Sequence, residues 1–244
     1  MIPMDNVISA FFANNWYWLL VFAGMSVLVF LLLRLQVLLR EHMAKNIQIL
    51  LVRDPGLCLE RLENNRRLKW LFRKPILLLW KLDCYLALGE DRKALQTIDL
   101  LRNAKLEPMD KLELYQKEIS FFSTSGNGDR AKKSFGDLKA FLKEAGADKE
   151  KHYAAILDEA EIIIGVYVDH NVSLIKKLTG RAEHTKNDVM RGVIQYRIAK
   201  LAWFKGDEEL MRTYLTRAGK NLKGTLYAPI IEAAREDPSI LETK

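Results

Sequence analysis

The chain has 244 residues, a formal net charge of +7, 49 % hydrophobic residues and two cysteines. Two cysteines, Cys58 and Cys84, are too few for a disulfide framework or a zinc site made of cysteines. Because both lie in apolar, helical-looking sequence, we expect buried thiols in a reducing compartment.

The stretch from Trp16 to Leu33 dominates the sequence, with eighteen residues (33 − 16 + 1) and no charge. A bilayer core about 30 Å thick requires roughly 20 mostly apolar residues in a helix. We therefore predict a single transmembrane helix over residues 16–33, preceded by a short external segment over residues 1–15. The hydroxyl of Ser26 can bond to a carbonyl of its own helix, which makes it compatible with this environment.

Two other interpretations of the apolar stretch remain open. A cleaved signal peptide is disfavoured, because it needs basic residues at its start and no Lys or Arg precedes Arg34. A core helix of a soluble protein is disfavoured because such a helix rarely lacks a polar face for five turns.

The flanking charges predict the orientation of the span. Residues 34–53 hold four basic side chains and one acidic side chain, whereas only Asp5 and the terminal amine precede the span. Since Lys and Arg are retained on the cytoplasmic side, we expect a cell-membrane protein with its N-terminus outside and its C-terminal domain in the cytosol. Trp16, Tyr17 and Trp18 would form half of an aromatic belt at the outer headgroups.

Beyond the span, apolar residues recur at steps of three and four up to Leu51, which predicts a helical stalk over residues 34–53. Asp54-Pro55-Gly56 then ends the helix, since Pro and Gly break helices and Asp favours turns. The remaining cytosolic domain, residues 54–244, is predicted to be all-α, made of helices joined by short turns and containing no strand. The expected helices cover residues 57–65, 76–88, 92–104, 109–124, 129–144, 149–168, 172–179, 188–205, 208–222 and 225–235.

The turns between paired helices centre on Gly89, Gly126, His170 and Gly206, with spacings of 37, 44 and 36 residues. Glycine suits such turns because it adopts positive φ without a Cβ clash. Small residues follow at matching places, where the two helices of a pair cross closely. Such residues are Ala94, five after the first turn, Ala131, five after the second, and Ala199, Ala202 and Ala218 around the last.

This pattern over residues 75–222 resembles the tetratricopeptide repeat, in a degenerate form without the family's Trp and without a turn glycine in the third unit. The resemblance implies an antiparallel helix-pair solenoid whose first helices line a groove for a peptide or a partner helix, and arrays of this kind act by binding. An irregular helical bundle is the alternative.

Groove residues follow only from the resemblance. By their offsets from Gly126 and Gly206, the exposed faces of two first helices carry Gln116, Ser120, Ser123, Tyr196, Lys200 and Trp203. The variant of the family that holds a partner's terminal carboxylate uses Lys and Asn at such places. Lys200 matches the Lys and no residue matches the Asn, which puts that ligand in doubt. Alternatively, Tyr196 and Trp203 belong to the core between repeats.

The most concentrated charge lies between Arg66 and Lys74, where five basic residues and no acid surround Trp70 and Phe72. We interpret Arg66, Arg67, Lys69, Arg73 and Lys74 as a candidate contact with anionic lipid, because basic side chains near such headgroups are attracted and aromatic rings suit the interface. The turn after the stalk would return this stretch to the membrane. A solvated helix face is equally compatible with the pattern, and nucleic-acid binding is disfavoured because no recognition element accompanies the charge.

Motifs for chemistry are not found in the sequence. Gly128 to Ser134 ends like a phosphate-binding loop but lacks its second glycine, and the four histidines are scattered without ligand spacing. We therefore expect no catalytic residue, no metal and no cofactor.

The sequence predicts a membrane-anchored adaptor or scaffold that recruits or assembles partner proteins, in a setting that its plain layout suggests is bacterial. An obligate structural subunit of a membrane complex and an enzyme with an unrecognised site remain alternatives. The identity of the partner, and whether it offers a peptide, a helix or another subunit, stays open.

Overall fold

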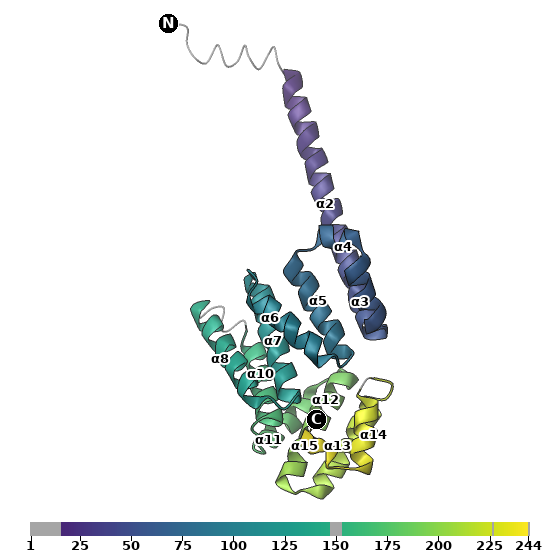
Figure 1. Cartoon of the computed structure of the whole chain (residues 1–244), viewed down its shortest axis with the longest axis vertical. Coiled ribbons are helices and arrows are strands. Elements are labelled where there is room, and N and C mark those ends of the chain that lie inside the picture. Colours follow the sequence, from purple (N-terminus) through teal and green to yellow (C-terminus); the bar gives the residue numbers. More distant parts are fainter. Residues whose placement is uncertain (1–15, 147–152, 226, 244) are drawn as a thin grey trace. The chain divides into compact units, whose positions relative to one another are not determined.

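The computed structural model describes residues 16–146, 153–225 and 227–243, with the side chains of 16–19 and 243 left undescribed. The protein is all-helical, with 83 % helix, and no strand occurs in these ranges (Figure 1). The expected external segment over residues 1–15 lies outside the described residues, as do the side chains of Trp16, Tyr17 and Trp18 that would form the aromatic belt. The chain divides into two compact units, residues 1–105 and 106–244, so the expected 54–244 domain extends over both.

Helix α2 (Trp16–Arg53) runs without interruption for 38 residues. Its side chains from Leu20 to Leu39 are exposed apart from the half-buried Gln36, and Figure 1 shows this part projecting beyond the other helices of its unit. Ser26 Oγ donates a hydrogen bond to the Phe22 carbonyl at 2.8 Å, as its place in an apolar helix requires. By length and composition, α2 is able to cross a membrane.

The end of α2 belongs to the core of the first unit. Ile47 is buried, and Met43, Leu50 and Leu51 pack against the same cluster. The helices that follow are α3 (Pro55–Asn64), α4 (Arg66–Leu71), α5 (Lys74–Ala87) and α6 (Asp91–Arg102). Asp54 separates α2 from α3, because its carboxylate accepts a hydrogen bond from the Leu57 amide at 2.9 Å and so caps the new helix.

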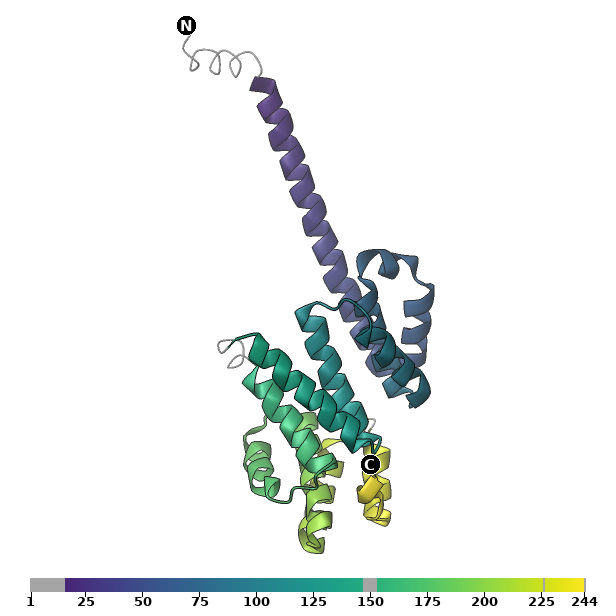
Figure 2. The same cartoon turned by 60° about the vertical axis from the view of Figure 1, so that its left-hand side comes forward.

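The second unit contains eight described helices, several of them packed as sequential neighbours. They are α7 (Pro108–Thr124), α8 (Gly128–Glu144), α10 (Ala154–Tyr167), α11 (Leu174–His184), α12 (Asp188–Lys205), α13 (Glu208–Asn221), α14 (Ala228–Glu236) and α15 (Ile240–Thr243). Helices α7 and α8 lie side by side, as do α12 and α13, and α10 packs on α7 (Figure 2). Ala199 and Ala202 of α12 and Ala218 of α13 are fully buried in one hydrophobic cluster, as expected for small residues where two helices pack closely.

The turns of the helix pairs have the expected backbone. Gly89, Gly126 and Gly206 adopt φ values of 68°, 76° and 74°. His170 stands at the corresponding turn after α10 and, at φ 49°, is the one non-glycine residue with positive φ among those described. After α14, where the sequence predicts no helix, α15 forms and buries Leu241 completely in the core around α12.

Candidate functional site

Two adjacent cavities in the second unit form the most developed site among the described residues. One has a volume of about 570 Å³ and the other about 300 Å³, and Thr124 and Tyr167 line both. We call the pair the Lys200 groove. Its lining consists of Ser123, Thr124, Ser125, Gly126, Gly128, Tyr167, Val168, His170, Lys200 and Glu242 in the larger cavity, and Thr124, Tyr167, Tyr196, Tyr227, Ile230 and Ile231 in the smaller.

Lys200 supplies a buried positive charge to the larger cavity. Only 2 % of the residue is exposed, and its Nζ donates a hydrogen bond to the Leu241 carbonyl in α15. The ammonium also lies over two aromatic rings, 5.5 Å from the centroid of Tyr167 and 5.6 Å from that of Phe204. Burial lowers the pKa of Lys200 to about 8, against the opposing effect of the Glu242 carboxylate. The side chain is therefore mostly charged at pH 7.

Ser123 adds a polar group to the lining of the same cavity. The residue is 4 % exposed, and its Oγ is buried with no hydrogen-bond partner in the protein. A buried hydroxyl left without a partner costs about 1–3 kcal/mol, so such groups are usually satisfied. Ser123 thus has hydrogen-bonding capacity for a group that enters the cavity.

His170 lines the same cavity as Lys200 and Ser123. Its left-handed backbone is unfavourable for a residue with a Cβ, and strained positions of this kind persist where the surroundings fix them. Here the imidazole stacks on Phe204 with centroids 3.7 Å apart and planes 21° apart, and its Nδ1 lies 3.2 Å from the Val166 carbonyl. Phe204 is also one of the two rings near the Lys200 ammonium. His170 therefore packs against a ring that contacts Lys200.

The smaller cavity is mainly aromatic and aliphatic. Burial raises the pKa of Tyr196, which keeps its phenol neutral at physiological pH. Burial also raises the pKa of Tyr167, although the neighbouring Arg197 guanidinium opposes the effect. Arg197 is itself paired with Glu159 at 2.6 Å. The groove therefore joins an apolar half to a half that carries one buried cation.

The six groove residues predicted from the sequence separate into two sets. Ser123, Tyr196 and Lys200 lie together in the Lys200 groove. Gln116 and Ser120 are exposed on α7 and do not line it, and Trp203 packs against the core of the second unit.

The expectation of an open face at Tyr196 and Lys200 is wrong, because these residues are only 5 % and 2 % exposed. The physical reason lies in the end of the chain. The short helix α15 packs on α12, and α14 contributes Ile230 and Ile231 beside Tyr196.

Sequence reasoning missed Tyr167, His170, Tyr227, Ile230 and Ile231. They come from α10 and α14 and from the turns beside these helices, which only the tertiary packing brings to α12. One signal was present in the sequence: His170 occupies a turn position at which the other helix pairs have glycine.

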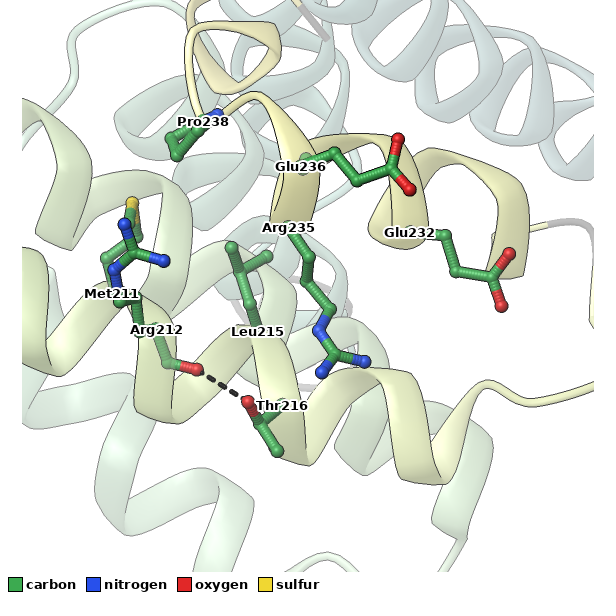
Figure 3. Close-up of a pocket in the computed structure, with 9 residues that line it drawn as sticks. Met211, Arg212, Leu215, Thr216, Glu232, Arg235, Glu236 and Pro238 are labelled. Carbon is green, nitrogen blue, oxygen red and sulfur yellow. Dashed lines mark hydrogen bonds between the residues drawn. The ribbon is translucent and has the colours of Figure 1, made fainter.

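A further cavity of about 520 Å³ lies between α13 and α14. Figure 3 shows Glu232 and Glu236 pointing away from Met211 and Arg212, while Thr216 donates a hydrogen bond to the Arg212 carbonyl at 2.9 Å. Its charged side chains are exposed and Arg212 is already paired with Glu208 at 2.7 Å, so this cavity lacks a buried polar group that would hold a ligand.

The candidate lipid contact forms the short helix α4 and its C-terminal flank in the first unit. Arg66, Arg67, Lys69, Arg73 and Lys74 are all exposed, whereas Leu68 and Leu71 are buried. Trp70 is 76 % exposed and Phe72 packs edge-on against Trp80 with centroids 4.7 Å apart. The two aromatic residues of this stretch therefore have different environments.

The two cysteines are free and buried, as expected. Burial raises the pKa of both thiols, and Cys58 Sγ contacts the Ile47 carbonyl at 3.8 Å. Within the described ranges, no group of three or more His, Cys, Asp or Glu side chains is arranged to hold a metal ion. Comparisons with family models, curated proteins and solved structures found no match to this chain.

Proposed function

We propose that the protein is a membrane-anchored adaptor in which α2 spans the membrane and the Lys200 groove receives a segment of a partner protein on the cytosolic side. The observation that carries this function is the groove, which combines a buried ammonium and an unpartnered hydroxyl with an apolar half.

The anchor is supported by the exposed length of α2. The part from Leu20 to Leu39, apolar except for Ser26, Arg34 and Gln36, covers twenty residues (39 − 20 + 1), which at about 1.5 Å per residue is close to the thickness of a bilayer core. Large side chains along it, such as Phe22, Leu28 and Phe30, are each more than half exposed. Soluble monomers rarely expose contiguous apolar surface on this scale, so the segment needs an apolar environment.

The groove favours a partner segment with two features. A carboxylate would be attracted to the Lys200 ammonium and could accept a hydrogen bond from Ser123 Oγ, and interactions of this kind are stronger than those between neutral groups. An adjacent aliphatic or aromatic side chain would fit among Tyr196, Tyr227 and Ile230. This pairing of one fixed polar contact with an apolar pocket is a common basis for selecting a short peptide.

The pairwise helix packing and the glycine turns are compatible with a tetratricopeptide-like array, and the adaptor role extends that interpretation. Helical arrays of this kind present concave surfaces to partners and act by binding.

The test measures peptide binding by the full-length protein in lipid nanodiscs. A library of random hexapeptides with free C-termini is compared with the same library amidated, which removes the terminal carboxylate. We expect binders to carry a free or side-chain carboxylate beside a large apolar residue. Lys200→Met should weaken them at least tenfold, and Arg212→Gln in the cavity of Figure 3 is the matched control that should leave them unchanged. Binding that is indifferent to Lys200 would refute the groove as the recognition site.

A further inference from the structure

Helix α4 lies against the part of α2 that is exposed and apolar. A cavity of about 460 Å³ is lined by Val29, Leu32, Leu33, Leu35, Gln36 and Leu39 of α2 together with Trp70 of α4. The two helices are also in direct contact within the first unit. Trp70 is thus placed at the C-terminal end of the proposed membrane span.

The packing of α3 on α2 explains why the chain returns to the C-terminal end of the proposed membrane span. After the Asp54 turn, α3 packs on the end of α2 and runs for ten residues, or about 15 Å at 1.5 Å per residue. Ten residues of α2 counted back from Arg53 end near Met43, where burial of α2 begins. Helix α4 therefore starts close to Leu39, so the stalk does not carry the basic stretch away from the apolar segment.

Helix α4 buries its leucines and exposes its tryptophan and its basic residues. Leu68 and Leu71 are 1 % and 5 % exposed, so these two side chains fix the helix to its unit. Trp70 and the basic residues are left at the surface. An exposed tryptophan next to exposed Lys and Arg is typical of elements that lie at a membrane–water interface, where the ring sits at headgroup level.

We propose that α4 and its flank form a binding surface for anionic lipid headgroups, with Trp70 at the interface and Arg66, Arg67, Lys69, Arg73 and Lys74 facing the phosphates. This surface rests on the proposed membrane anchor, because α2 brings it to the bilayer. The charge acts over roughly 8 Å at physiological salt, so only a surface held this close to the headgroups is attracted.

Anionic lipid is the occupant that the geometry favours. The basic stretch adjoins the apolar segment of α2 through the residues from Val29 to Leu39, and Arg34 and Arg40 of α2 add charge of the same sign nearby. An acidic protein or a nucleic acid would use the charge, but neither explains why the exposed Trp70 lies beside the lipid-facing side chains.

The test uses the full-length protein in vesicles of neutral phosphatidylcholine or of phosphatidylcholine with 30 % phosphatidylglycerol. A fluorescent maleimide is attached at Trp70→Cys, at Met25→Cys in α2 or at Leu100→Cys in α6, where the native side chains are 76 %, 57 % and 59 % exposed. Quenching is then measured in the presence of two lipids, one that carries a nitroxide near its headgroup and one that carries a nitroxide deep in its acyl chain. The buried native thiols give a constant background.

We expect the label at position 25 to be quenched in both vesicles and the label at position 100 in neither. The label at position 70 should be quenched at least twofold more strongly in the anionic vesicles than in the neutral ones. Absence of quenching at position 25 would refute the anchor. Quenching at position 25 with none at position 70 would overturn the α4 surface and leave the anchor standing. Equal quenching at position 70 in both vesicles would overturn the recognition of anionic headgroups.

Charge variants identify the groups responsible. Arg66→Gln, Arg67→Gln and Lys69→Gln together should remove the excess quenching at position 70 seen with anionic lipid. Lys133→Gln, Lys186→Gln and Lys220→Gln remove the same charge from exposed positions of the second unit and are the matched control. An effect of the same size in both triple variants would show that total charge, and not α4, attracts the membrane. A stronger response of the label to a short DNA duplex than to anionic vesicles would also overturn lipid as the ligand.

Discussion

The wild-type protein should gain stability between pH 7.5 and pH 9.5, and Lys200→Met should lose this gain. Burial lowers the pKa of Lys200 from 10.5 to about 8 in the folded protein. The unfolded chain keeps the ordinary value, so between these two pKa values the unfolded state binds more protons than the folded state. The free energy of unfolding then increases with pH, because the cost of burying the ammonium is complete below pH 8 and disappears as the group loses its proton.

The size of the effect follows from the two pKa values. At 1.36 kcal/mol per pKa unit, a fall from 10.5 to about 8 corresponds to roughly 3 kcal/mol over the whole titration. Linkage places about 2 kcal/mol of this between pH 7.5 and pH 9.5. Methionine keeps most of the apolar stem of lysine and has no proton to lose, so Lys200→Met should lack this component.

The assay is urea unfolding of the full-length protein in detergent micelles at a series of pH values. The signal is tryptophan fluorescence, to which Trp203 contributes because it packs against the core of the second unit. The quantity of interest is the wild-type stability minus that of Lys200→Met at each pH. Lys186→Met, at an exposed lysine, is the matched control and should keep the wild-type pH dependence. Parallel curves for wild type and Lys200→Met would refute a charged, buried Lys200.

Three further substitutions test the packing of the second unit, each measured by thermal unfolding with circular dichroism. Gly192→Ala should destabilise the protein by about 1–3 kcal/mol, because a Cβ there would lie 2.6 Å from Leu222 Cγ. Gly136→Ala is the control: a Cβ there has no neighbour within 4 Å, so the substitution should stabilise the helix by up to about 1 kcal/mol. An equal effect at both glycines would argue against a close contact at the first. Ser134→Ala should cost about 1–3 kcal/mol, because Ser134 Oγ donates a hydrogen bond at 2.7 Å to the fully buried carboxylate of Glu118; an unchanged melting temperature would contradict this.

The helices of this chain could be predicted because their signals are local. Pro75 lies in the first turn of α5 and Asn127 caps α8, so the expected starts at residues 76 and 129 are within two residues of the observed ones. The short helix α4 was absent from the expected helices. The short helix α15 was also missed, because its formation depends on tertiary contacts. Its four residues are too few to show a period, and they are fixed by the burial of Leu241 and its hydrogen bond with Lys200.

The same distinction applies to the candidate site. The offset from a turn glycine identified Lys200 and Tyr196 on α12, because positions within one helix follow from its period. It could not show that α14 and α15 cover this face, since that depends on how nonadjacent helices pack. The result is a groove with a buried cation, where the sequence predicted an open surface.

The orientation of α2 is the remaining prediction that a single experiment can test. Four basic residues and one acid in residues 34–53 favour a cytosolic C-terminal side, since Lys and Arg beside a span resist translocation. A cysteine at Asn6→Cys should therefore react with a membrane-impermeant maleimide in intact cells. Val52→Cys, at a side chain 75 % exposed on the other side, should react only after the cells are permeabilised.

The native thiols should not react with the maleimide in this experiment. Cys58 and Cys84 are both 0 % exposed, and burial raises the pKa of both, which keeps the reactive thiolate scarce. The unsubstituted protein should accordingly remain unlabelled. Labelling of Val52→Cys in intact cells would show that the orientation is the opposite of the proposed one and that the Lys200 groove lies outside the cytosol. A cleaved signal peptide would give a different result. Cleavage would remove the Asn6→Cys label and lower the mass of the mature chain. The two modifications together therefore separate an anchor in the proposed orientation from an inverted one and from a cleaved leader.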